Sequence, residues 1–99
     1  MGEAYTDRDR ILCAAFFSVT PNQELQVGPT TRKIWPKATM AGIYHLVEIG
    51  VITEIGDHHY QGSKIARELA FEFMDFSEER KKAAQKTIID RPTKDGESE

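Results

Sequence analysis

The sequence predicts a single small domain that is mainly α-helical and carries a small β-hairpin. The chain has 99 residues, of which 39% are hydrophobic, enough for one modest core. Apolar residues recur at helical spacing in three segments, residues 6–19, 37–49 and 63–76. Between the last two lies VITEIGDHHY (residues 51–60), a run rich in β-branched residues that contains turn chemistry. Such a run is typical of a hairpin.

The first helix is expected over residues 6–19. Thr6 can cap its N-terminus, and Asp7 and Asp9 suit the positive end of the helix dipole. Residues 20–22 (TPN) should end it, because proline disfavours helical conformation in the residue before it. Helical spacing predicts a buried face made of Ile11, Leu12, Ala15 and Phe16.

A short strand and two helices are expected next. Leu25 and Val27 alternate with polar neighbours, which indicates a short strand. Pro29 favours the start of a short helix over residues 30–35, since a proline at the first helical position loses no hydrogen bond. Pro36 then separates this helix from a longer one over residues 37–49. The buried stripe of the longer helix is predicted to be Met40, Ile43, Leu46, Val47 and Ile49.

The hairpin and the last helix complete the domain. Gly50 is placed to end the longer helix in the left-handed conformation. Ser63 should cap a helix that runs to residue 76 and has a wide apolar surface. The hairpin and the flanking segments are assigned as strand 51–55, turn 56–58, returning strand 59–61, N-terminal tail 1–5, polar helix extension 77–89 and disordered tail 90–99.

This order of elements resembles the winged helix-turn-helix family. The most telling residues are YHLVEIGVITEIGDHHY (44–60) followed by GSKIARELA (62–70). The resemblance covers residues 6–76. It implies a DNA-binding domain in which the helix over 37–49 enters the major groove, the hairpin forms a wing and the next helix makes dimer contacts. The chain departs from the family pattern at the wing tip, where Asp57 stands in place of a basic residue, and the groove helix has no arginine.

The charge pattern favours the same partner, double-stranded DNA. Residues 25–47 contain no Asp or Glu, although the chain has 16 acidic residues and a net charge of −3. The same stretch holds Arg32, Lys33 and Lys37, which phosphates attract. The residues expected to contact DNA are Thr30, Thr31, Arg32, Lys33, Lys37, Thr39, Ala41, Tyr44, His45, His58 and His59. Thr39 and Tyr44 fit a half-buried position equally well, and the two adjacent histidines also fit a plain polar turn.

Four apolar residues of the last helix point around much of its circumference, and one small core can hardly cover them all. They are Phe71, Phe73, Met74 and Phe76. We expect them to form the interface of a homodimer, which would read a palindromic site. The alternative is that the first helix, with Phe16 and Phe17, covers these rings within one chain.

The sequence offers little support for catalysis, a cofactor or a metal. It contains no Ser-His-acid arrangement, phosphate loop or HExxH string. Adjacent histidines point to opposite faces of a strand, which argues against a shared metal ion. The lone Cys13 cannot form an internal disulfide and lies among apolar residues, so it reads as a buried, inert thiol.

The expected location is the cytoplasm. The sequence has no run of about 18 apolar residues, the length that a membrane-spanning helix needs, and no signal peptide at its start. Two functional hypotheses follow. The first is a small dimeric transcription regulator, most simply a repressor. The alternative is a protein–protein interaction module on the same fold, such as a complex subunit or a small phage-type inhibitor, which the negative net charge and acidic wing favour.

Overall fold

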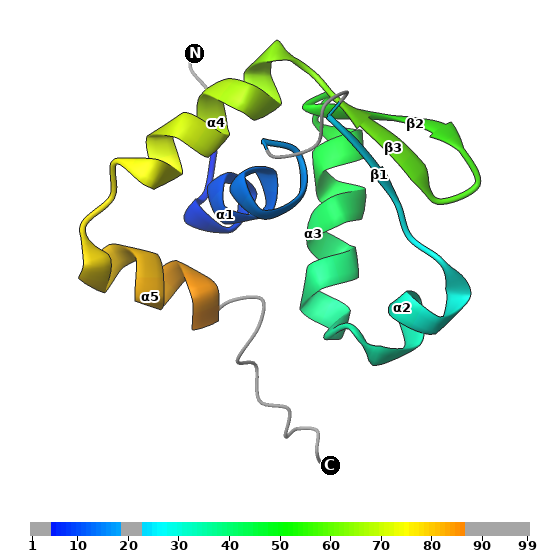
Figure 1. Ribbon diagram of the computed structural model, residues 1–99, viewed down its shortest axis with the longest axis horizontal. Coiled ribbons are helices and arrows are strands. Elements are labelled where there is room, and N and C mark those ends of the chain that lie inside the picture. The colour runs from blue at the N-terminus through cyan, green and yellow to red at the C-terminus, as the bar shows by residue number, and fades with distance from the viewer. Residues whose placement is uncertain (1–4, 19–22, 87–99) are drawn as a thin grey trace.

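The computed structural model describes residues 5–18 and 23–86. Predictions for residues 1–4, for 19–22, for the extension at 87–89 and for the tail 90–99 lie outside these ranges. The chain is mainly helical with a small antiparallel sheet, as predicted (Figure 1). Its elements in chain order are α1 (Asp7–Phe16), β1 (Glu24–Gln26), α2 (Pro29–Ile34), α3 (Lys37–Glu48), β2 (Ile52–Gly56), β3 (His59–Gly62), α4 (Lys64–Met74) and α5 (Glu78–Lys86).

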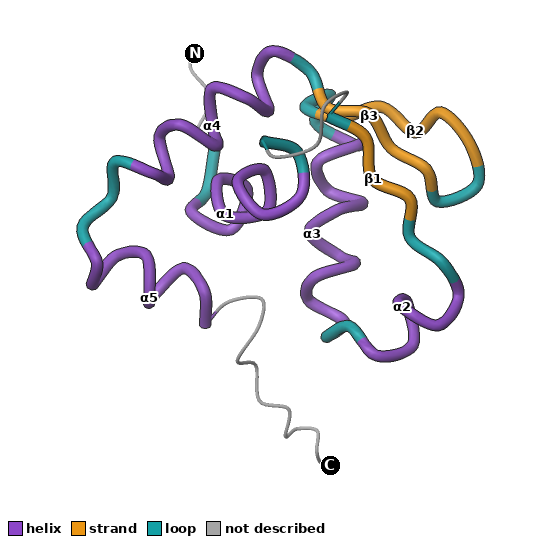
Figure 2. Tube along the Cα trace, viewed as in Figure 1, coloured by secondary structure: helices purple, strands orange, loops and turns teal. Residues whose placement is uncertain are grey.

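Helix α1 is the centre of the molecule and contacts α3, α4 and α5 (Figure 2). Its N-terminus has the predicted cap. The Thr6 hydroxyl accepts from Asp9 N at 3.1 Å, and Asp9 Oδ2 accepts from Thr6 N at 3.0 Å. This reciprocal pair satisfies two backbone donors that the first helical turn leaves free.

The predicted buried face of α1 is wrong at Ala15 and partly right at Phe16, which packs against the core. Ile11 and Leu12 are buried as expected, but Ala15 is exposed and Phe16 is only half-buried. Phe17 is fully buried instead. The reason is that α1 ends at Phe16, and Phe17 has non-helical backbone angles (φ −123°, ψ −7°). Helical spacing therefore does not govern the direction of its side chain.

The sheet has three strands in the order β1-β3-β2, one more than the predicted hairpin. The hairpin itself is β2–β3, with a bulge between Glu54 and Gly56 and with His58 at φ 53° in the turn. Strand β1 pairs with β3 in antiparallel register, with Leu25 opposite Tyr60. Sequence periodicity predicted a strand near Leu25 but gave no indication of its partner.

The C-terminus of α3 follows the prediction in its backbone but not in its burial. Gly50 has φ +81°, the left-handed conformation that glycine adopts without strain. Met40, Ile43 and Leu46 are buried. Ile49, which was predicted to extend this stripe, is 39% exposed because α3 ends at Glu48 and Ile49 is its cap.

Residues 77–86 do not continue α4, which corrects the predicted extension. Helix α4 ends at Met74, and α5 begins at Glu78 after a turn in which the Ser77 hydroxyl accepts from Arg80 N at 3.2 Å. Helix α5 then turns back to contact α1, and its Ala84 is buried in the common core (Figure 1). Residues 77–86 therefore belong to the same packed unit as the other helices.

An ion pair joins the start of α1 to α5. Arg80 Nε and Nη2 lie 3.1 and 2.9 Å from the two carboxylate oxygens of Asp7. The hydrogen bonds from Arg80 hold the pKa of Asp7 below its usual value of 3.8. Because the pKa of Asp7 is lower in the folded than in the unfolded state, the charged carboxylate stabilises the fold at pH values above the unfolded-state pKa. This contribution is lost as pH falls through the folded-state pKa.

We therefore expect Asp7→Asn to lower the melting temperature at pH 6 but not at pH values below the folded-state pKa of Asp7. The effect at pH 6 should be below about 1 kcal/mol, because the pair is solvent-exposed and screened. Thermal unfolding at a series of pH values measures it. Asp75→Asn is the matched control, since Asp75 lies in the exposed α4–α5 turn and forms no ion pair within the described residues. A melting-temperature difference at pH 6 of the same size in both variants would contradict the assignment.

Candidate nucleic-acid interface

One face of α3 points away from the core. Lys37, Ala41, Tyr44 and Glu48 are all exposed and follow the spacing of a single helical stripe. Three of these four residues were predicted to contact DNA. The stripe begins at the cation Lys37 and ends at the acid Glu48. Its first half therefore attracts a phosphate backbone and its last residue repels one. The N-terminal half of α3 is the part suited to an anionic partner.

Two predicted contact residues of α3 lie elsewhere. Thr39 is only 3% exposed, so its expected place on the outer face is wrong. His45 is turned toward α1, with its Nε2 4.0 Å from Asp9 Oδ1 and its Nδ1 4.0 Å from Glu48 Oε1. The physical reason is that α1 packs beside α3 and widens the covered arc of this helix to include Thr39 and Gly42.

Helix α2 has no buried residue and lies next to the start of α3 (Figure 1). Thr30 and Lys33 are exposed, and Thr31 and Arg32 are half-buried. Arg32 Nη1 donates to Val27 O at 2.7 Å, which fixes its guanidinium against the end of β1.

The three cations of this region have no acidic partner. Among residues 5–18 and 23–86, none of the residues Arg32, Lys33 and Lys37 forms an ion pair with an acidic side chain. Together they form the surface that we call the basic face: Arg32, Lys33 and Lys37. Ile34, 73% exposed, lies next to it, and no helical stripe in the sequence pointed to this position.

The hairpin tip lies next to the outer face of α3. Tyr44 Oη is 3.3 Å from His58 Nε2, and the two rings are 6.3 Å apart. His58 Nδ1 is in turn 3.1 Å from Asp57 Oδ1, and His58 N donates to Glu54 Oε2 at 3.3 Å. Two exposed carboxylates therefore surround the predicted contact residue His58. They would oppose a phosphate that approached the tip.

His59 contacts a different part of the molecule. Its Nε2 lies 2.9 Å from Glu24 Oε1 on the neighbouring strand β1. The two histidines thus have separate acidic neighbours. Within the part of the chain that the structure describes, no group of three or more histidine, cysteine or acidic side chains is placed to hold a metal ion.

The four apolar residues expected at a dimer interface divide into two pairs. Phe71 and Met74 are 59% and 60% exposed. Phe73 packs on the core, and Phe76 is half-buried with Arg80 Cζ 3.8 Å from its ring centroid. One chain thus covers Phe73 and Phe76 in part and leaves Phe71 and Met74 exposed, and the dimer interface itself stays a prediction. Of these four residues, Phe71 and Met74 are the two with more than half of their surface exposed.

Cys13 is fully buried, and burial raises its pKa to about 12, with the nearby Asp9 carboxylate adding to the rise. The thiol is therefore protonated near neutral pH and is a poor nucleophile. Burial also raises the pKa of Tyr60 to about 12. No helix within the described ranges has both the length and the apolar character needed to cross a bilayer.

No protein-family model, curated protein or solved structure matches the chain. The arguments about its function therefore rest on the geometry of its own residues. That geometry combines an unpaired basic face on α2 and the start of α3 with an exposed tyrosine and a hairpin beside it. Glu48, which closes the outer stripe of α3, was missed as part of this surface. Its spacing of 11 residues from Lys37 could have identified it.

Proposed function

We propose that the chain is a small winged helix-turn-helix protein that binds double-stranded DNA as a homodimer and represses transcription by occupying a promoter. The observation that carries the proposal is the basic face, Arg32, Lys33 and Lys37, which has no acidic partner within the described residues. Unpaired cations on one face attract the phosphate backbone, which supplies most of the affinity of non-specific DNA binding.

The arrangement of elements supports the same proposal. A short helix, a longer helix and a two-stranded hairpin follow each other directly, and the first strand completes the sheet beside the hairpin. In this proposal α3 enters the major groove by its N-terminal half, where Lys37 can contact guanine or phosphate and Ala41 a thymine methyl group. Tyr44 and the threonines Thr30 and Thr31 would bond phosphate oxygens.

The dimer would use the exposed part of α4. Phe71 and Met74 lie three residues apart and share one helical face. Two copies would bring six cations to DNA instead of three, and a two-fold axis would match a palindromic site.

Titration of the protein into mixed-sequence duplex DNA at several salt concentrations tests the proposal. Six phosphate contacts predict a slope of log affinity against log salt of about −5. The variant Lys33→Gln/Lys37→Gln retains only the two Arg32 contacts of a dimer, and its slope should fall to about −2. Fluorescence anisotropy of a labelled duplex gives both slopes.

The matched control is Lys64→Gln/Lys86→Gln, which removes the same charge from exposed lysines of α4 and α5. It should bind with nearly the wild-type slope, since neither lysine belongs to the basic face. Equal losses in the two double variants would mean that only net charge matters and that α2 and α3 form no interface. Absence of binding by the folded protein at low salt would overturn the proposal altogether.

The second candidate is a protein–protein interaction module on the same fold. The specific observation in its favour is the hairpin tip, where the exposed acids Glu54 and Asp57 would repel phosphate. The exposed Phe71 and Met74 would then bind a different protein instead of a second copy. Sedimentation of the isolated protein discriminates the two uses of this surface. If the surface binds a second copy, the wild type should be a dimer and Phe71→Asp a monomer. If it binds a different protein, the purified wild type should already be a monomer.

A further inference from the structure

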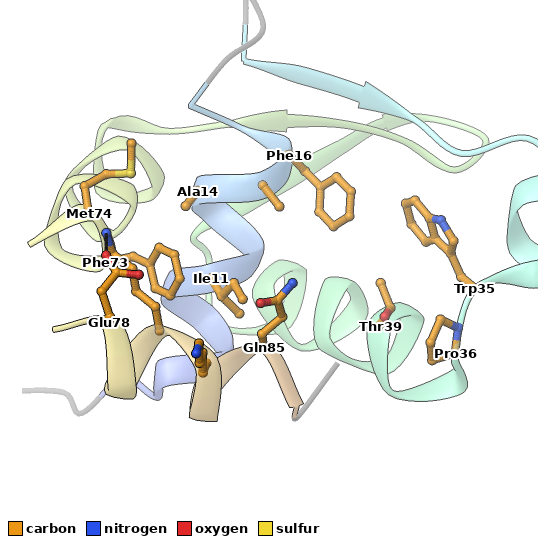
Figure 3. Close-up of a pocket in the computed structure, with 13 residues that line it drawn as sticks. Ile11, Ala14, Phe16, Trp35, Pro36, Thr39, Phe73, Met74, Glu78 and Gln85 are labelled. Carbon is orange, nitrogen blue, oxygen red and sulfur yellow. Dashed lines mark ion pairs between the residues drawn. The ribbon is translucent and has the colours of Figure 1, made fainter. Parts of the chain in front are cut away.

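An apolar groove lies on the side of α1 that faces α5 and the α2–α3 link. Its volume is about 700 Å³, within the range of small-molecule sites, which are usually lined by apolar and aromatic side chains. Ile11 and Thr39 lie at its base and are almost fully buried. Figure 3 shows Phe16 and Trp35 on one side of the groove and Phe73 on the other.

The walls of the groove are held in place by packing. The rings of Phe16 and Trp35 are 4.9 Å apart and inclined by 33°, and both residues pack against the core. Phe73 packs on the core and on Phe76, with ring centroids 5.4 Å apart. The groove thus combines pre-formed aromatic walls with space between them, which lowers the entropy cost of binding an apolar ligand.

The rim of the groove carries an excess positive charge. Lys81 and Lys82 of α5 both line it, together with the acid Glu78. Lys81 Nζ lies 3.8 Å from Glu78 Oε2, so these two charges balance. Lys82 is exposed and, within residues 5–18 and 23–86, forms no ion pair. One cation is therefore left at the edge of an otherwise apolar site.

We propose that this groove binds a free monocarboxylate with a medium-sized apolar body, which lies between Phe73 and the Phe16–Trp35 pair while its carboxylate meets Lys82. The proposal goes beyond DNA binding and does not depend on it. An apolar body accounts for the lining, and a single negative charge matches the single uncompensated cation of the rim.

The probes that test the proposal are octanoate, 1-octanol and octylammonium, which share one chain and differ in charge. Trp35 is the only tryptophan of the protein, so its emission reports occupancy of the groove directly. Octanoate should produce a saturable change in emission. Octylammonium should bind about fivefold more weakly than octanoate, because attraction at an exposed lysine is replaced by repulsion. Isothermal calorimetry provides a second readout.

Two pairs of variants locate the site. Ala15→Phe should abolish saturable octanoate binding by filling the groove. Ala83, another exposed alanine, lies on α5 and does not line the groove, so Ala83→Phe should bind as the wild type does. Lys82→Gln should weaken octanoate binding about threefold, whereas Lys64→Gln should leave it unchanged. The lysine variants retain every apolar contact, so they test the anion site even where Ala15→Phe disturbs the fold.

Three results would overturn the proposal. The first is no saturable response to octanoate in the folded protein. The second is equal affinity for the three probes, which would indicate a general apolar surface without an anion site. The third result combines two observations: the wild type gives no response to octanoate, and the double variant Ile88→Asp/Ile89→Asp shifts Trp35 emission in the absence of any probe. That result would mean that the chain's own C-terminal residues occupy the groove.

Discussion

Replacement of Phe17 by alanine should lower the free energy of unfolding by about 3–5 kcal/mol, the usual cost of removing a fully buried aromatic ring. Phe17 follows α1 directly and has 0% exposure. Its ring packs so closely on the end of β3 that a Cβ at Gly62 would lie 3.2 Å from Phe17 Cδ1. The ring therefore joins α1 to the sheet, and its loss leaves a cavity at this junction.

Urea-induced unfolding followed by far-ultraviolet circular dichroism measures this effect. Phe71→Ala is the matched control, because it removes the same ring from a position that is 59% exposed. Its free energy of unfolding, measured at a concentration where the protein is monomeric, should change by no more than about 0.5 kcal/mol. Similar losses in the two variants would mean that Phe17 does not occupy the core.

Gly42→Val should destabilise the protein by about 3 kcal/mol, at the upper end of the usual cost of overpacking a core. Gly42 of α3 is buried and faces Leu12 and Arg8 of α1. A Cβ at this position would lie 2.4 Å from Leu12 Cδ1 and 3.4 Å from Arg8 Nε. Leu12 is fully buried, so a larger side chain at position 42 requires Leu12 or the two helices to shift within a packed core.

The neighbouring substitution Ala41→Val separates this clash from helix propensity. Ala41 is exposed on the same helix, so valine there should cost only about 0.5 kcal/mol through its lower helix propensity. Thermal unfolding of the two variants gives the comparison. If Gly42→Val unfolds no more easily than Ala41→Val, α1 and α3 are not in close contact at this position.

Local signals in the sequence predicted the boundaries of several elements correctly. The cap at Thr6, the cap at Ser63 and the left-handed Gly50 are all present as expected. Each depends on the hydrogen bonding or backbone freedom of a few neighbouring residues, so the information lies within one turn of the chain.

The errors arose where distant residues decide the outcome. The exchange of Phe16 for Phe17 in the core depends on the direction of the chain after α1 ends. The break between α4 and α5 is accompanied by contacts of α5 with α1, including the pair of Arg80 with Asp7, which lie 73 residues apart in the sequence. Neither effect has a signature in the local spacing of apolar residues.

The sequence predicted the charged residues of the candidate site better than it predicted which residues lie on the outer face of α3. The absence of acids from residues 25–47 identified the basic face, and Lys33 and Lys37 are exposed as expected. Thr39 and His45 were misplaced because spacing around a single buried stripe does not reveal that α1 covers a second side of α3. The contact of Tyr44 with His58 was also beyond reach, since it requires the relative placement of α3 and the hairpin.

The pairing of β1 with β3 bears on the order in which the chain folds. Strands β2 and β3 are joined by a short turn, and such hairpins form within about 1–10 μs. Glu24 of β1, however, pairs with Gln61, and the segment between them includes α2, α3 and β2. Closing so long a loop costs entropy before its contacts are made. We therefore expect β1 to join the sheet last, and α2, which follows it in sequence, to become fixed only at that step.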